Sequence, residues 1–307
     1  MDIFLQQIIN GLTLGSVYAI VALGYTMVYG IIQLINFAHG EVVMIGAMVA
    51  FSVISALAGT AVPPLLIVLA GILAAIPVCM LVGYAMERIA YRPLRGAPRL
   101  APLITAIGIS IILQHVALLV WSRNPLAFPQ IIPLASFDVG GAVITGVQIA
   151  IIVTSVLMMA GLTLLVYRTK LGIAMRATSQ NPQVAGLMGI DIDRIIAFTF
   201  IVGAALAAVA GVMVGTYYGI GHYTMGSLLG LKAFSAAVLG GIGNLAGAML
   251  GGILLGIVEA LGAGYIGDLT NNVFGSNYQD VFAFLVLIAV LVFRHSGLLG
   301  ERVGDRA

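Results

Sequence analysis

The chain has 307 residues, of which 61% are hydrophobic and only 8% are charged, and its formal net charge is +2. A soluble domain carries roughly 25% charged residues, so this composition excludes a water-covered surface of normal extent. The fold class that it predicts is an all-α, polytopic bundle of transmembrane helices. A nucleic-acid partner is not expected, because the basic residues gather beside the predicted spans instead of forming a basic surface.

Apolar runs that approach or exceed the roughly 20 residues needed to cross a bilayer recur along the whole chain. Separate runs cover 8–32, 42–58, 63–86, 101–121, 146–167, 195–219 and 278–293. The stretch 228–264 is long enough for two crossings if it turns near Gly240 to Gly247. We therefore expect one transmembrane domain over residues 1–307, with about 8–10 crossings that can include re-entrant half-helices.

Basic residues beside spans mark the cytoplasmic side of a membrane protein. Of the 13 Lys and Arg residues, most fall in three clusters: Arg88, Arg92, Arg95 and Arg99; Arg168, Lys170, Arg176 and Arg194; Arg294, Arg302 and Arg306. All three clusters are cytoplasmic together if 122–145 is an outer loop, and this arrangement predicts a cytoplasmic carboxyl terminus. The side of the amino terminus stays open. Three crossings within 1–87 would put it outside, and a re-entrant pair within 34–55 would put it inside.

A polar segment, 168–194, lies between the runs 146–167 and 195–219 and is predicted to be a cytoplasmic loop with a short helix. Asn181 and Pro182 are typical of a helix cap followed by a first-turn proline, and Gly189 stands where such a helix would end. A capped helix between two spans is suited to contact with a soluble partner. Arg176, Ala185, Gly186 and Leu187 are its candidate docking residues.

Polar residues within the apolar runs are the next candidates, because intramembrane ionisable groups are costly. His39 and Glu41 lie between two apolar runs, where they would line a polar cavity or form a turn at the membrane surface. We expect Lys232 to lie near the outer interface and Glu259 to be interfacial as well. Gln114 is expected to form hydrogen bonds between helices.

Glycines recur at a spacing of four near the end of the chain, at Gly243, Gly247 and Gly251, and again at Gly252 and Gly256. Small residues at this spacing let helix backbones approach closely in lipid. We expect close helix packing here, with a break at Gly240–Gly243 as a further hypothesis. A weak internal repeat is suggested by two Tyr-Gly-Ile triplets, at Tyr29 and Tyr218, each of which precedes a polar, glycine-containing patch.

Nothing in the sequence has the spacing of a catalytic or metal site, so no enzyme activity, metal or cofactor is expected. The chain lacks the G-x-x-x-x-G-K-[ST] loop that holds nucleotide phosphates, and its only lysines are Lys170 and Lys232. If ATP drives a process in which this chain takes part, another chain binds that ATP.

Four segments in order resemble the LivH-type permease subunit of bacterial ABC importers for branched-chain amino acids. They are NGLTLGSVYAIVALGYTMVYGIIQLINFAHGEVVMIG from Asn10, AMERIAYRPLR from Ala85, GIDIDRIIAFTFIVGAALAAVAGV from Gly189, and LKAFSAAVLGGIGNLAGAMLGGILLGIVEAL from Leu231. The resemblance covers nearly the whole chain and departs mostly in the loop 122–145 and in the tail after Arg294.

This resemblance implies a permease of the bacterial inner membrane that works with a second homologous permease, two cytoplasmic ABC ATPase subunits and a periplasmic substrate-binding protein. The coupling segment of the family corresponds to residues of about 172–190 in this chain. A branched aliphatic amino acid needs apolar walls and a few polar groups, and the candidate path residues are Asn36, His39, Glu41 and Ser235. Three alternatives stay open: a stand-alone channel or facilitator, an ion-coupled transporter, and an importer of urea, short amides or other amino acids.

Overall fold

The computed structural model describes residues 2–98, 100–131, 135–269, 278–294 and 296–300. Its elements, in chain order, are α1 (Asp2–Ile32), α2 (His39–Leu57), α3 (Pro64–Ala85), the π-helix η1 (Met86–Tyr91), the 3₁₀ turn η2 (Arg92–Leu94), α4 (Leu100–Val120), β1 (Leu126–Ala127), β2 (Ser136–Val139), β3 (Ala142–Thr145), α5 (Gly146–Arg168), α6 (Lys170–Gln180), α7 (Pro182–Leu187), α8 (Ile192–Tyr218), β4 (Ile220–Gly221), α9 (Met225–Gly240), α10 (Leu245–Leu269) and α11 (Gln279–Phe293).

The all-α membrane bundle predicted from composition is confirmed. Within the described ranges, seven helices are long and apolar enough to cross a membrane, and α9 and α11 are shorter apolar helices. Each predicted run coincides with a helix to within a few residues, except that α1 begins earlier than its run. The stretch 228–264, for which two crossings were expected, forms α9 and α10, of which only α10 is long enough to count as a span, and the chain turns between Gly240 and Leu245.

The first part of the chain forms three helices, so the alternative of a re-entrant pair within 34–55 is wrong. Residues 39–57 form the single helix α2. The first residue of α2, His39, lies beside Gly24, in the middle of α1. The two are in close contact, since a Cβ added to Gly24 would lie 2.6 Å from Cε1 of His39. At 1.5 Å per residue, that level is about 12 Å from the end of α1 at Ile32. The connection 33–38 therefore returns into the bundle, and Gln33 makes the bend with a φ of 51°.

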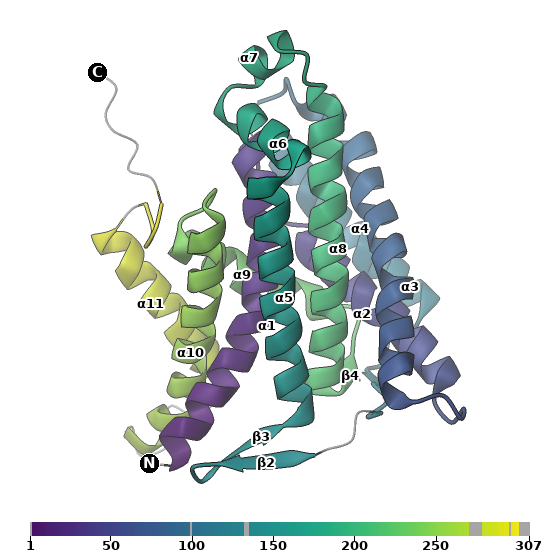
Figure 1. The fold of residues 1–307 in the computed structure, drawn as a ribbon, viewed down its shortest axis with the longest axis vertical. Helices are drawn as coiled ribbons and strands as arrows, with labels where there is room; N and C mark the ends of the chain where they lie inside the picture. The colour runs from purple at the N-terminus through teal and green to yellow at the C-terminus, as the bar shows by residue number, and fades with distance from the viewer. Residues whose placement is uncertain (1, 99, 132–134, 270–277, 295, 301–307) are drawn as a thin grey trace.

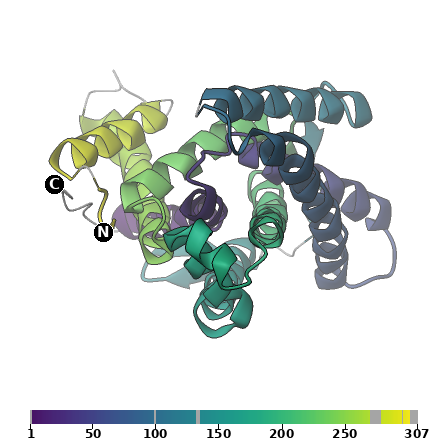
Figure 2. The ribbon, with the colours of Figure 1, turned by 90° about the horizontal axis from the view of Figure 1, so that it is seen from above.

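Helices α1 and α8 form the centre of the bundle, and both are largely buried, whereas α3, α4 and α5 expose most of their surface. Seen from above, α1 lies near the middle, and α4 and α11 lie at the rim (Figure 2). Small residues of α8, such as Ala208 and Gly211, let the backbone of α2 approach closely. The exposed residues of the rim helices are mainly large and apolar, as expected for a surface that contacts lipid or another membrane subunit.

The two ends of the bundle differ in structure. Helices α6 and α7 project at one end, and the antiparallel ribbon β2–β3 lies at the other, near the start of α1 (Figure 1). The side chain of Gln6 joins α1 to this ribbon, since it accepts from the amide of Val143 at 2.8 Å and donates to its carbonyl at 3.0 Å. Strands β1 and β4 also pair. The end that bears α6 and α7 is the more protruding one.

Candidate functional site

The helices α6 and α7 form a protruding element whose local caps are set by the sequence. Thr169 accepts from the amide of Gly172 at 3.0 Å and begins α6, and Asn181 accepts from the amide of Val184 at 3.0 Å and begins α7. Gly189 has a φ of 85°, a conformation that glycine adopts without strain, just after α7 ends. The predicted cap, first-turn Pro182 and helix stop are therefore confirmed.

The surface of this element is apolar at its tip. Leu187 and Met188 are 87% and 80% exposed, and Val184 is half exposed. Arg176 lies over the ring of Tyr167, 5.2 Å from its centroid. The prediction that Ala185 contacts a partner is wrong, because Ala185 is buried and its carbonyl accepts from the amide of Ile190.

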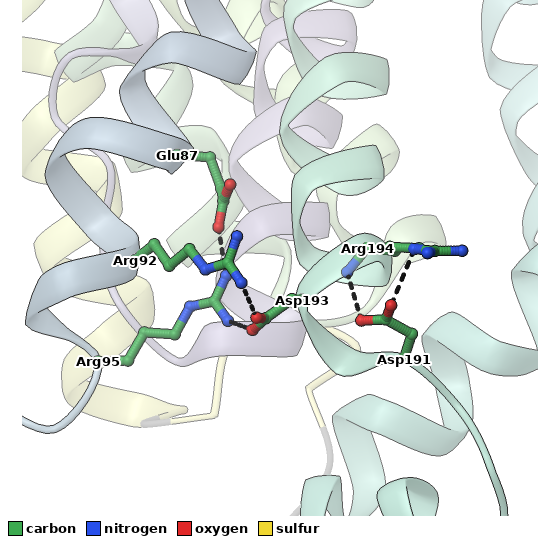
Figure 3. A network of polar contacts seen from close by, with 6 residues as sticks. All are labelled: Glu87, Arg92, Arg95, Asp191, Asp193 and Arg194. Carbon is green, nitrogen blue, oxygen red and sulfur yellow. Dashed lines mark hydrogen bonds and ion pairs between the residues drawn. The ribbon is translucent and has the colours of Figure 1, made fainter.

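A network of ion pairs lies beside this element (Figure 3). Asp193, in the first turn of α8, pairs with both Arg92 and Arg95, and Arg95 also pairs with the buried Glu87 of η1. The neighbouring Asp191 caps α8 and pairs separately with Arg194. The network joins the end of the α3 span to the beginning of α8.

The sequence treats Arg92 and Arg95 only as markers of membrane side, so this network is a functional candidate that sequence reasoning missed. Glu87 was the available signal, since it is an acidic residue directly after the apolar run 63–86 and is followed at once by Arg88. The π-helix that bears it is a second signal, visible only in the structure, because π-helical turns are frequent at functional sites.

Three of the predicted path residues come together where α2 begins. The side chain of Asn36 accepts from the amide of Ala38 at 3.1 Å and from the hydroxyl of Tyr91 at 3.0 Å, and it so links the connection 33–38 to η1. His39 is buried with its ring edge-on to Tyr25, and its Nε2 has no hydrogen-bond partner within the described residues.

Glu41 is the third of these residues, and it is 1% exposed. Its Oε1 accepts from Ser110 at 3.1 Å and Gln114 at 2.9 Å, both on α4, and from Ser227 on α9 at 2.9 Å. The expected interhelical role of Gln114 is thereby confirmed. This polar junction, formed by Glu41, Ser110, Gln114 and Ser227, is called the Glu41 cluster below. The alternative of a turn at the membrane surface does not fit such burial.

Ser235, the fourth predicted path residue, is not part of this cluster. It is buried on α9 and donates to the carbonyl of Leu231 on its own helix at 2.8 Å. Such a bond satisfies the hydroxyl locally, and it is common for serines in membrane helices. The structure therefore gathers three of the four candidates and leaves Ser235 apart.

Lys232 and Glu259, which the sequence analysis expected near the membrane interface, are buried between helices of the bundle and are not exposed at its surface. Lys232 Nζ donates to Glu259 Oε1 at 2.7 Å and lies 2.6 Å from Asp280 Oδ1. Tyr18 of α1 donates to Glu259 Oε2 at 3.0 Å. Each charge has a partner from another helix, and this pairing offsets part of the free-energy cost of removing the charges from water.

The glycines near the chain end take different positions. A Cβ on Gly247 or Gly251 would collide with the backbone of α9 near Gly240, and one on Gly252 or Gly256 would collide with the backbone of α1. Gly243 does not pack in a helix, contrary to the prediction, because it lies in the turn between α9 and α10 with a φ of 98° and an open Cβ position.

The described residues contain no group of three His, Cys, Asp or Glu side chains that could hold a metal ion. The arrangement instead offers a membrane bundle with a buried polar junction and a protruding apolar element. Such a bundle is suited to moving a solute across a membrane if a protein that binds the protruding element changes the conformation of the bundle.

Comparison with known proteins identifies the family. Residues 7–291 match the model of the permease component of branched-chain amino acid transport systems. The chain belongs to this family of transport permeases. A high-affinity branched-chain amino acid transport system permease protein, BraD of Pseudomonas aeruginosa, is 51% identical over 97% of this chain and 96% of its own length.

Other members are also similar over nearly the whole chain. The permease protein LivH of Escherichia coli is 46% identical over 97% of this chain and 96% of its own, and a probable LivH of Methanocaldococcus jannaschii is 30% identical over 97% and 94%. No solved structure matches the chain significantly. Family membership confirms the resemblance to LivH-type permeases, and it makes this chain a permease component of a transport system and not an enzyme.

Proposed function

We propose that this chain is the membrane-spanning permease subunit of an ATP-driven importer of leucine, isoleucine and valine. The observation that carries the proposal is the capped α6–α7 element, whose exposed Leu187 and Met188 offer an apolar contact surface at one end of the bundle, in a chain that belongs to the family of transport permeases. The relatives named for branched-chain amino acid transport support the cargo. A channel or facilitator works without an ATPase and would not need a docking element of this kind.

The partners in this proposal are a second, homologous permease, two cytoplasmic ABC ATPase subunits and a periplasmic substrate-binding protein. The bundle lies in the bacterial inner membrane with α6 and α7 on the cytoplasmic side. This orientation agrees with the basic residues beside that element, including Arg168, Lys170 and Arg194. It places the β2–β3 ribbon and the start of α1 on the periplasmic side, and the carboxyl terminus in the cytoplasm.

Coupling to ATP hydrolysis runs through the loop 168–194 in this proposal. Leu187, with Val184 and Met188 beside it, docks into the ATPase, and Arg176 is a polar anchor. Asn181, Pro182 and Gly189 fix the two ends of α7, and Gly186 keeps the docking face small. Closure of the ATPases moves this element.

Movement then reaches the bundle by two routes. Helices α5 and α8 are continuous with the element in sequence, and they rotate with it. The second route is polar: Asp193 pairs with Arg92 and Arg95, Arg95 pairs with Glu87 of η1, and Tyr91 of η1 donates to Asn36 next to the start of α2. This chain of contacts links the docking element to the candidate path in two states of alternating access.

The path in this proposal passes the start of α2, where Asn36, His39 and Glu41 supply polar groups among apolar walls, and continues along α9 near Ser235. The aromatic rings of Tyr25 and Phe234 border the same region, with centroids 5.9 Å apart. An apolar side chain of the substrate fits such surroundings.

The test is uptake of radiolabelled leucine, isoleucine and valine into proteoliposomes that contain this chain with its candidate partner subunits. ATP is supplied on the side of the ATPases, and each assay is run with and without the binding protein. Uptake that requires both ATP and binding protein is the expected result. Flux through this chain alone, without ATP, would make it a channel or facilitator and would contradict the coupling role of α6–α7. Uptake of urea, amides or other amino acids in place of these three would change the cargo only.

A further inference from the structure

The Glu41 carboxylate is unusual among the buried charges of this bundle because no basic side chain of the described residues pairs with it. Glu259 has Lys232, and Glu87 has Arg95. Glu41 has only the uncharged donors Ser110, Gln114 and Ser227, and all three reach the same oxygen, Oε1. Its second oxygen, Oε2, is buried without a hydrogen-bond partner. A buried anion without a cation is strongly unfavourable unless it takes up a proton or a positively charged ligand.

Oε2 lies beside Gly226 of α9, a residue without a side chain. A Cβ built on Gly226 would lie 2.6 Å from Glu41 Oε2 and 2.5 Å from the carbonyl oxygen of Gly40. Two acceptors therefore converge on the same side of Gly226. Gly230, one turn further along α9, also lies close to Gly40, since its Cβ would be 3.0 Å from the Cα of Gly40.

Gly40, Gly226 and Gly230 thus form a seam, along which α2 and α9 touch backbone to backbone. In this structure the seam is closed: the two backbones are in contact at Gly40, with the Tyr25 hydroxyl and Glu41 Oε2 beside the contact. A small separation of α2 from α9 would leave Glu41 Oε2 and the Gly40 carbonyl facing the gap. Both groups accept hydrogen bonds, and one is an anion, so the ligand that suits them is a compact cation with several N–H donors.

We infer that Glu41, with the Gly40 carbonyl, binds the α-ammonium group of the transported amino acid when the seam between α2 and α9 opens. Ser110, Gln114 and Ser227 are positioning residues that hold the carboxylate in place through Oε1. The inference rests on the proposed function and deepens it, because it assigns one charged end of the substrate to one side chain. The start of α2 also favours the ionised carboxylate, since Glu41 lies in the first turn, where the helix dipole stabilises an anion.

Two substitutions separate charge from shape. Glu41→Gln keeps the length of the side chain and an oxygen that can accept from Ser110, Gln114 and Ser227, but it removes the charge. Glu41→Asp keeps the charge but withdraws it by one methylene group. Thr163→Val is the matched control, because it removes an intramembrane hydroxyl of α5 that bonds only to its own helix, to the carbonyl of Met159 at 2.7 Å.

The assay is ATP-dependent leucine uptake by the reconstituted complex, with assembly checked for each variant by co-purification of the partner subunits and gel filtration. We expect Glu41→Gln to lower uptake about tenfold to a hundredfold, as for loss of a charged hydrogen bond. Glu41→Asp should retain at least several times the uptake of Glu41→Gln, and Thr163→Val should resemble the unmodified complex.

A structural role predicts a different order. If Glu41 only holds α2, α4 and α9 together, the longer and neutral Gln replaces it better than Asp does. Uptake by the Gln variant that equals or exceeds uptake by the Asp variant therefore overturns the inference, whether both are active or both are inactive. Absence of leucine uptake by the unmodified complex rejects the proposed function itself, and it is distinguishable because it needs no variant.

Discussion

The buried ion pair of Lys232 and Glu259 predicts a measurable loss of stability when one partner is removed. The side chain of Lys232 is 7% exposed and that of Glu259 is 1% exposed, and their charged atoms are 2.7 Å apart. Replacing Lys232 with Met keeps the volume but leaves Glu259 without its cation. Removal of one member of a buried pair costs about 3–5 kcal/mol, because the remaining charge is unpaired.

The assay is thermal unfolding of the purified chain in detergent, followed by intrinsic fluorescence or by aggregation. At about 2 °C for each kcal/mol in a chain of this size, the loss for Lys232→Met corresponds to a decrease in Tm of about 6–10 °C. The second variant is Lys232→Met combined with Glu259→Gln, in which the Gln oxygen still accepts from Tyr18.

The double variant should recover about half or more of the lost Tm, because it removes the buried anion along with its partner. Asp280 remains in both variants; its side chain is 32% exposed, and its buried Oδ1 loses Lys232 equally in the two variants, so it does not affect the comparison between them. A Lys232→Met chain that unfolds within about 2 °C of the unmodified one would refute the reasoning. A double variant no more stable than the single one would refute it as well.

Three further substitutions test other parts of the bundle. Gly252→Leu should destabilise the chain by about 1–3 kcal/mol or more in the same unfolding assay, since even its Cβ would lie 2.8 Å from the Cβ of Ala19, and Gly161→Leu, at an open position, should not. Gly186→Trp should lower uptake about fivefold or more while ATP hydrolysis and assembly persist; normal uptake would contradict docking of α7. Asp193→Asn should change stability by less than about 1 kcal/mol, since the Asp193 side chain is 43% exposed. It should nevertheless lower uptake per ATP hydrolysed about fivefold or more; unchanged coupling would exclude the polar route.

The positions of the helices could be predicted from the sequence because they depend on local properties. An apolar run of sufficient length has to form a helix in lipid, since its backbone groups find no other partners there. The caps are local as well: Asn181 needs only the amide of Val184, three residues away. The turn between α9 and α10 was predictable because glycines cluster there, and Gly241 and Gly243 both have positive φ values.

Partners that lie far apart in the chain could not be predicted in this way. Lys232 and Glu259 each look costly in isolation, so the interface is the reasonable place for them until the bundle brings them together with Asp280 from a third helix. Ala185 was misjudged for a related reason. Its small size suits a docking surface, but the register of α7 turns it toward the bundle and turns Leu187 outward.

The two Tyr-Gly-Ile triplets of the weak repeat precede two helices, α2 and α9, whose first turns are in contact. The first triplet lies in the last turn of α1 and the second at the end of α8, and after each one the chain leaves the helix and begins a new one, α2 or α9. These two beginnings meet, because Gly40 of α2 touches Gly226 of α9 and Glu41 accepts from Ser227.

Irregular backbone at membrane depth is tolerated only where protein buries it or where it lines a polar cavity. The connection 33–38 meets this condition through Asn36, which pairs with Tyr91 of η1. Both helix beginnings and the link to the ion-pair network therefore converge on a single region. Helices η1 and α4 contact this region through Tyr91 and through Gln114, so a movement of either helix would reach the seam between α2 and α9. Substitutions at Tyr91 and at Gln114 should accordingly impair the same step of transport, although the two residues lie on different helices.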